Sequence, residues 1–156
     1  MSLYSRFLRR VGDRRWFAAV ASRLAPRLDR SVYRLTRGRR MATPPSVPTF
    51  LLTTTGRHSG LPRTVAVSYL ADGPDFIVVG SNWGKAATPE WASNLVVNPK
   101  AEIDVGGKRA AIEAQLVPDA KRAEWWESFG AMWPAYTTYR DRASNREILM
   151  FRLCAQ

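Results

Sequence analysis

The sequence predicts a mainly β protein with inserted helices (α+β), built as an antiparallel barrel behind an N-terminal helical arm. Six short apolar or alternating stretches follow one another between turns, which is the pattern of antiparallel strands. Only two helices are expected among these strands, too few to connect parallel strands by crossovers. The first forty residues differ from the rest in charge and periodicity, and are therefore expected to form the arm.

The composition of the 156-residue chain narrows the classes of protein to consider. The length suits one domain with a sizeable core. No apolar run approaches the roughly 20 residues of a transmembrane helix, and the N-terminus is too charged for a signal peptide. The lone histidine and lone cysteine, His58 and Cys154, form neither a disulfide nor the ligand set of a zinc site. We therefore expect a cytoplasmic protein without a metal site.

Residues 1–40 are predicted to be a basic, amphipathic helical arm. They carry twelve arginines against two acidic residues, whereas the rest of the chain is almost neutral. Apolar residues recur at helical spacing on one face: Phe17, Val20, Leu24, Leu28, Val32 and Leu35. Pro26 interrupts this pattern and predicts a kink or two shorter helices.

Three roles remain open for this arm. Its apolar face packs on the domain, or it lies on an anionic membrane surface as basic amphipathic helices do, or it binds nucleic acid. The arm has no recognisable nucleic-acid-binding module and no aromatic stacking platform, so nucleic acid is the least favoured partner. The membrane alternative would place the protein peripherally on the inner face of the cell membrane.

Beyond the arm, "MATPPSVP" at 41–48 is typical of a proline-rich linker, and residues 49–156 are predicted to form the barrel domain. Strands are predicted at 49–55, 62–70, 75–81, 101–105, 108–117 and 147–153. "PEWASNLVVN" at 89–98 predicts a helix with Thr88 as N-cap, and "PDAKRAEWWESFGAMW" at 118–133 predicts another that begins at Asp119.

No pattern supports catalysis by side chains alone. His58 lies outside any nucleophile elbow, and the sequence contains neither a Walker loop nor a dinucleotide-binding fingerprint. Paired carboxylates that would mark a cleft are not visible either. If the protein is an enzyme, a cofactor supplies its chemistry.

Two turns look suited to such a cofactor. In "TTTGRHSG" at 53–60 the glycines permit positive φ, and cationic and hydroxyl side chains surround the spot where an anion would lie. A plain hairpin turn with solvated arginines is the alternative. In "GSNWGKAATPEWASNL" at 80–95 small residues precede a helix that bears a tryptophan, so a flat ring could lie on the backbone under Trp83 or Trp91.

Taken together, these segments resemble the deazaflavin-dependent nitroreductase family, small split-barrel oxidoreductases that use coenzyme F-420 (8-hydroxy-5-deazaflavin). The motifs keep their order and spacing without gaps over about residues 48–153. They are L-T-T-T-G-R-x-S-G-x-P-R at 52–63, G-S-N-W-G at 80–84, P-x-W-x-x-N-L at 89–95, N-P at 98–99, W-P-A-Y-x-x-Y at 133–139 and R-E-I at 146–148. The resemblance implies a split antiparallel β-barrel of the FMN-binding-like type.

The resemblance also implies the residues of the site. The phosphate of the cofactor tail would be held by Arg57, His58, Ser59 and Arg63. The ring system would lie near Ser81, Asn82, Trp83 and Gly84, a loop buttressed by Trp91 and Asn94. Gly60, Thr64 and Gly80 complete the cofactor-binding set. Tyr136 and Tyr139 would line the substrate side as catalytic candidates, with a tyrosine or water delivering the proton.

The implied activity is that of a deazaflavin-dependent reductase, which transfers a hydride from reduced F-420 to a quinone, a nitro compound or an activated alkene. The chain departs from the family where His58 replaces a customary lysine, where Trp83 lies in a loop that commonly carries small residues, and where Trp133 replaces a tyrosine; Leu149 also replaces a proline. Two other functions stay open: an FMN-binding split-barrel oxidoreductase, and a non-enzymatic F-420-binding or membrane-recruited module. A homodimer is also open, because split barrels often pair.

Overall fold

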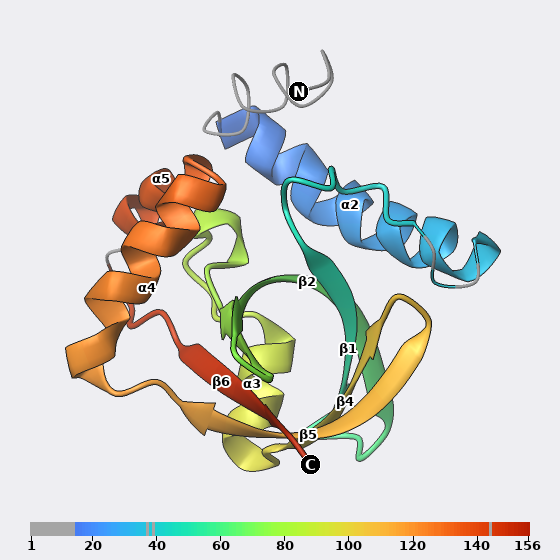
Figure 1. Cartoon of the computed structure of the whole chain (residues 1–156). Helices are drawn as coiled ribbons and strands as arrows, with labels where there is room; N and C mark the ends of the chain where they lie inside the picture. The colour runs from blue at the N-terminus through green and yellow to red at the C-terminus, as the bar shows by residue number, and fades with distance from the viewer. Residues whose placement is uncertain (1–14, 37, 39, 144) are drawn as a thin grey trace.

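The computed structural model describes residues 15–36, 38, 40–143 and 145–156, and it shows a closed antiparallel barrel with helices around it (Figure 1). The strands are β1 (Thr49–Thr55), β2 (Pro62–Asp72), β3 (Asp75–Val79), β4 (Lys100–Val105), β5 (Lys108–Leu116) and β6 (Met150–Ala155). They follow one another around the barrel in the order β1-β2-β3-β6-β5-β4, and each neighbouring pair is antiparallel. The predicted fold class is confirmed.

The barrel interior is filled by the apolar side chains of the strands. Phe50 and Leu52 of β1 are fully buried and share one core cluster with Ile103, Phe151 and Leu153 of other strands. Five of the strands begin within one residue of the predicted position, whereas β6 begins at Met150 instead of residue 147. The reason is that Arg122 pairs with Glu147 and donates to the carbonyl of Ile148, so this segment bonds to a helix and not to the sheet.

Three helices and one short turn follow the first strands: α3 (Glu90–Val97), α4 (Asp119–Met132), α5 (Ala135–Arg142) and the 3-10 turn η1 (Asn82–Gly84). Helix α3 contributes Ala92 and Leu95 to the core of the barrel. Helices α4 and α5 lie side by side at one flank of the molecule, and their apolar residues build a second core cluster around Phe129 (Figure 1).

One expectation about these helices was wrong, and one helix was missed. Thr88 does not cap α3; the N-cap is Pro89, whose extended backbone places its carbonyl to accept the amides of Ala92 and Ser93. Helix α5 was not predicted, because its sequence is polar and follows α4 after only Trp133 and Pro134.

The arm contains one helix, α2 (Arg15–Leu35), which continues through position 26, so the expectation of two shorter helices was wrong. Polar contacts beyond that position hold the helix on the barrel. Asp29 accepts from the amide and hydroxyl of Thr43 at 2.7 and 2.6 Å. The hydroxyl of Tyr33 donates to Asp104 and accepts from the amide of Gly107 at 2.7 Å. These contacts outweigh the missing helical hydrogen bond of a proline.

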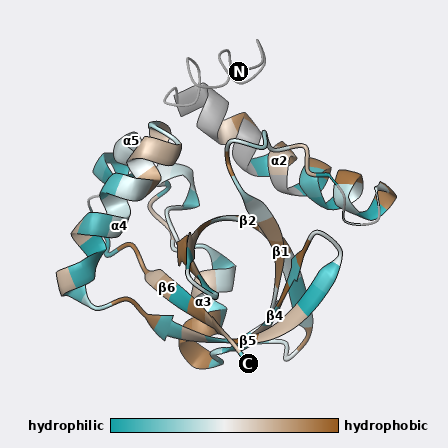
Figure 2. Cartoon of the chain, in the orientation of Figure 1, coloured by the Kyte–Doolittle hydropathy of each residue, from teal (hydrophilic) through white to brown (hydrophobic). Residues whose placement is uncertain are grey.

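The apolar row of α2 does not form the contact with the barrel that the packing alternative assumes. Val20, Leu24 and Leu28 are each about half exposed, and Leu35 is 84% exposed. Figure 2 shows brown and teal segments alternating along the part of α2 that is coloured. Buried Asp29 and Tyr33 make the contact instead.

The remaining predictions about the arm are not decided by the structure. Residues 1–14 lie outside the described residues, and the division into arm, linker and domain stays a prediction. Among the described helices, none is both long enough and apolar enough to cross a membrane.

Candidate cofactor site

A cavity of about 700 Å³ lies between α2, the 42–47 segment, β2, the loop after β3, α3 and α5. This volume is in the range of sites for cofactor-sized ligands. Predicted site residues that line it are Arg63, Thr64, Ser81, Asn82, Trp83, Trp91, Asn94, Tyr136 and Tyr139. Predicted site residues outside its lining are Arg57, His58, Ser59, Gly60, Gly80 and Gly84. The structure thus brings together most of the predicted set and places the tip of the first turn at the rim.

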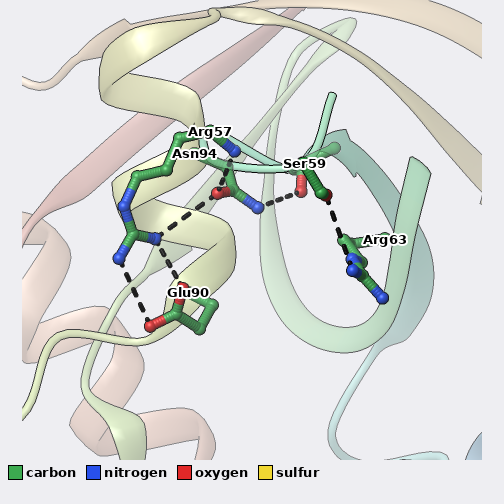
Figure 3. Close-up of polar contacts among 6 residues, drawn as sticks. Arg57, Ser59, Arg63, Glu90 and Asn94 are labelled. Atoms are coloured by element: carbon green, nitrogen blue, oxygen red, sulfur yellow. Dashed lines mark hydrogen bonds and ion pairs between the residues drawn. The ribbon is translucent and has the colours of Figure 1, made fainter. Parts of the chain in front are cut away.

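The turn between β1 and β2 is bound by Asn94 of α3. The amide of Gly56 donates to the carbonyl of Leu61 at 2.9 Å, which closes the turn. The buried Asn94 accepts from the amide of Arg57 at 3.0 Å and donates to the hydroxyl of Thr54 at 3.0 Å (Figure 3). Asn94 therefore supports this turn and not loop 80–84, which corrects the expected contact.

The two arginines of the turn differ in their partners. The guanidinium of Arg57 forms an ion pair with Glu90 of α3, with Nη1 and Oε2 2.5 Å apart (Figure 3). This cation lowers the pKa of Glu90. Arg63 reaches the hydroxyl of Ser59 at 3.5 Å and lines the cavity. Arg63 is therefore the cation of this turn that an anion in the cavity meets first, while His58 is exposed at the tip.

The loop after β3 has an uncommon backbone. Asn82, Trp83 and Gly84 take positive φ values of 47°, 59° and 75° in succession. Side chains other than glycine rarely adopt this region, and such residues gather at functional sites. The side-chain amide of Asn82 donates to the backbone carbonyl of Ala87 at 2.8 Å. This backbone brings Trp83 to the cavity, with its ring 5.9 Å from that of Tyr139.

The aromatic side of the cavity is formed by α5. Tyr136 and Tyr139 are buried and lie one helical turn apart, with ring centroids at 5.8 Å. Burial raises the pKa of Tyr136 well above its ordinary value, which a hydrogen bond with the side chain of Ser68 only partly opposes. Tyr136 is therefore a neutral hydroxyl at physiological pH.

Some lining residues were missed from the sequence. Ser68 faces Tyr136, and Asp29, Leu24 and Leu28 of α2 also line the cavity. The apolar row of α2 was visible as a pattern, but no local signal indicated that it would face a cavity. Arg146 was noted only within the R-E-I motif, and it bonds directly to the loop after β3.

A closed six-stranded antiparallel barrel with an aromatic-lined cavity is the architecture of a split-barrel, cofactor-binding protein. A family model described as F420H(2)-dependent quinone reductase matches residues 24–153. The chain therefore belongs to the F420H(2)-dependent quinone reductase family.

Individual relatives agree with this membership. An F420H(2)-dependent quinone reductase of Mycobacterium tuberculosis is 35% identical over 135 residues, which cover 84% of this chain and 91% of that protein. The solved structure of an F420-H2 dependent reductase is similar with a TM-score of 0.61 and 28% identity, covering 68% of this chain and 93% of that one. A solved domain-swapped dimer has the same fold, with a TM-score of 0.64 and 24% identity over 80% of this chain and 94% of that one.

The family confirms the resemblance that the motifs predicted. It also confirms the expected class, an oxidoreductase enzyme with reduced F-420 as its reductant.

Proposed function

We propose that this protein reduces a quinone by hydride transfer from reduced F-420, with both molecules bound in the 700 Å³ cavity. The observation that carries the proposal is the composition of this one space. It joins Arg63 of the β1–β2 turn, the loop residues Ser81 to Trp83, and the tyrosines of α5. These three segments are far apart in the sequence and meet only because the barrel closes.

The residues present fit a flat cofactor with an anionic tail. The lining is mainly apolar and aromatic, as ring-binding sites are. Arg63 offers a planar guanidinium at the rim, which suits a phosphate, and Thr64 lies beside it. Ser81, Asn82 and Trp83 would contact the ring system, while Trp91 would close the same side. When bound, the cofactor supplies the hydride.

The remaining site candidates would act from the rim or through the backbone. Arg57 is held by Glu90, so its share in tail binding would require that ion pair to loosen. His58 and Ser59 are exposed at the tip, where they would meet the anionic tail. Gly60, Gly80 and Gly84 would shape the two loops without touching the ligand.

Tyr136 and Tyr139 would orient the acceptor. Because burial keeps Tyr136 protonated, its hydroxyl can donate a hydrogen bond to a quinone oxygen without losing its proton. The proton that completes quinone reduction would then come from Tyr139 or from water.

Fluorescence titrations of the purified protein with F-420 and with FMN test the cofactor. We expect micromolar binding of F-420 that Arg63→Gln weakens about tenfold, the loss of one charge-assisted contact. Arg109→Gln, on exposed β5, is the matched control and should leave binding unchanged. Tighter binding of FMN would favour the flavin alternative. Binding of F-420 without oxidation by a quinone, a nitro compound or an enone would favour a non-enzymatic carrier.

We also propose that α2 binds an anionic membrane surface, which would place the enzyme peripherally on the inner face of the cell membrane. The half-exposed apolar row and the exposed Arg23, Arg27 and Arg34 on the same helix support this. Deleting residues 1–40 would remove the contacts of Asp29 and Tyr33 as well, so point variants are sharper. Arg27→Gln with Leu35→Ser, neither of which lines the cavity, should reduce sedimentation with anionic vesicles, whereas Arg109→Gln should not.

A homodimer stays a prediction, supported only by the swapped dimer of a similar fold. Light scattering on the full chain tests it: a mass of one chain would contradict it.

A further inference from the structure

Arg146 lies in the segment before β6, and most hydrogen bonds of its guanidinium go to the loop after β3. Nη2 donates to the carbonyl oxygens of Gly80 and Ser81, each at 3.0 Å, and Nε donates to that of Lys85 at 3.2 Å. Nη1 donates to the carbonyl of Glu147 at 3.3 Å. Among the described residues no carboxylate lies within ion-pair distance of this guanidinium, so its bonds go to backbone carbonyls.

The carbonyls that Arg146 binds stand at the two ends of the uncommon backbone. Gly80 and Ser81 precede the three positive-φ residues, and Lys85 follows them. A planar guanidinium can bridge both ends at once because its donors point in fixed, separate directions. A lysine ammonium has one nitrogen and cannot span them in the same way.

The loop needs such a bridge, because its conformation is not one that its residues adopt by themselves. Asn82 and Trp83 are not glycine, yet both take positive φ. On the other side, Gly84 leaves no room: a Cβ there would lie 3.1 Å from the Cα of Tyr139. The loop is thus held between the guanidinium and α5.

We propose that Arg146 is a positioning residue of the cofactor site, which fastens both ends of loop 80–85 and thereby sets where Trp83 stands in the cavity. The guanidinium is partly buried, and this burial, which disfavours its charged form, lowers its pKa. Its consequence for F-420 binding rests on the proposed function, whereas its effect on the loop does not.

Limited proteolysis of the ligand-free protein tests the fastening directly. Lys85 is exposed, and trypsin cleaves after it only when the loop opens. We expect Arg146→Met to raise the rate of cleavage between Lys85 and Ala86 about tenfold, measured by mass spectrometry of the new terminus. Arg146→Lys should give an intermediate rate, because it keeps the charge but reaches only one end of the loop.

Arg122→Met is the control for loss of a partly buried guanidinium, since Arg122 donates to the carbonyl of Ile148 and pairs with Asp119 and Glu147, contacts that hold the segment before β6 and not loop 80–85 itself. It should lower the melting temperature without raising cleavage after Lys85. An unchanged rate in Arg146→Met, or an equal rise in Arg122→Met, would overturn the proposal.

A second readout uses the fluorescence titration with F-420. Arg146→Met should weaken F-420 binding about tenfold, and Arg146→Lys should restore part of that loss. If the wild-type chain binds no F-420 at all, the proposed function fails, while the cleavage data still decide whether Arg146 fastens the loop.

Discussion

The β1–β2 turn and the loop after β3 meet the same cavity but are held in opposite ways. The turn is held by the buried, neutral Asn94 and by the exposed ion pair of Arg57 with Glu90, and the space around Gly60 is open. Loop 80–85 is held by a cation on one side and by the backbone of α5 on the other, and Gly84 has no free space. The tip of the turn therefore has room for changes, whereas the loop is constrained along its length.

The largest effect should come from removing the buried support of the turn. Asn94→Ala leaves the amide of Arg57 and the hydroxyl of Thr54 without their buried partner, so we expect a loss of about 3 kcal/mol in the free energy of unfolding. Urea unfolding measures it. Asn98→Ala, at the exposed end of the same helix, is the control and should cost less than about 1 kcal/mol. Equal losses in both variants would contradict the special role of Asn94.

A pair of glycine variants compares the two loops directly. Both positions have positive φ, so alanine is strained at each, but only Gly84 also lacks space: a Cβ would lie 3.0 Å from that of Arg142. We expect Gly60→Ala to cost about 1 kcal/mol and Gly84→Ala about 2–3 kcal/mol in thermal or urea unfolding. The comparison fails if Gly60→Ala is the more damaging of the two.

Helix α2 contacts both β2 and η1, so weakening its attachment to the barrel should affect the strand after the turn and the loop after β3 together. Tyr33→Phe removes the hydrogen bonds to Asp104 and to the amide of Gly107 and should cost about 2 kcal/mol. Burial and the bond to Asp104 raise the pKa of Tyr33 to about 12. Because the folded pKa lies above the unfolded value, this stabilisation is complete below about pH 10 and is lost as pH rises toward 12.

Unfolding measured from pH 8 to pH 12 therefore distinguishes the variant from the wild type. The difference in stability should shrink at the alkaline end. A difference that is constant over this range would mean that ionisation of Tyr33 does not govern the contact.

The smallest effect should follow from Glu90→Gln at the rim of the turn. The ion pair with Arg57 has a largely exposed carboxylate, so its loss should change stability by less than about 0.5 kcal/mol. Binding of F-420 should tighten about twofold, because Arg57 is released toward the anionic tail. Weaker binding would show that Glu90 helps to place Arg57. Arg57 lowers the pKa of Glu90, so the small stabilisation by this ion pair is complete above the ordinary pKa of a glutamate. It is lost as pH falls through the lowered pKa.

Much of the fold could be predicted because strands and turns carry local signals. Alternation identified β2, β4 and β5, while apolar, β-rich runs between turns identified β1 and β3; Gly106 and Gly107, both at positive φ, closed the hairpin between β4 and β5. The errors arose where distant contacts decide. Arg122 of α4 keeps Glu147 out of β6, and contacts of Asp29 and Tyr33 keep α2 continuous past Pro26.

The candidate site divides in the same way. The motifs identified the segments around Arg63, Trp83 and Tyr136, all of which line the cavity. They did not indicate that Arg57 would be bound by Glu90, since nothing local distinguishes it from Arg63. The tyrosines of α5 were recognised as a motif, whereas the polar helix that carries them was not.

The sequence by itself determined the order of the strands along the chain, the positions of the glycine turns and the family, because these are properties of short segments and their spacing. Tertiary structure alone decided which arginine faces the cavity, which turn Asn94 supports and which loop Arg146 binds. Each of these pairs joins residues more than thirty positions apart. Only closure of the barrel brings such residues within hydrogen-bonding distance, and no local pattern encodes that approach.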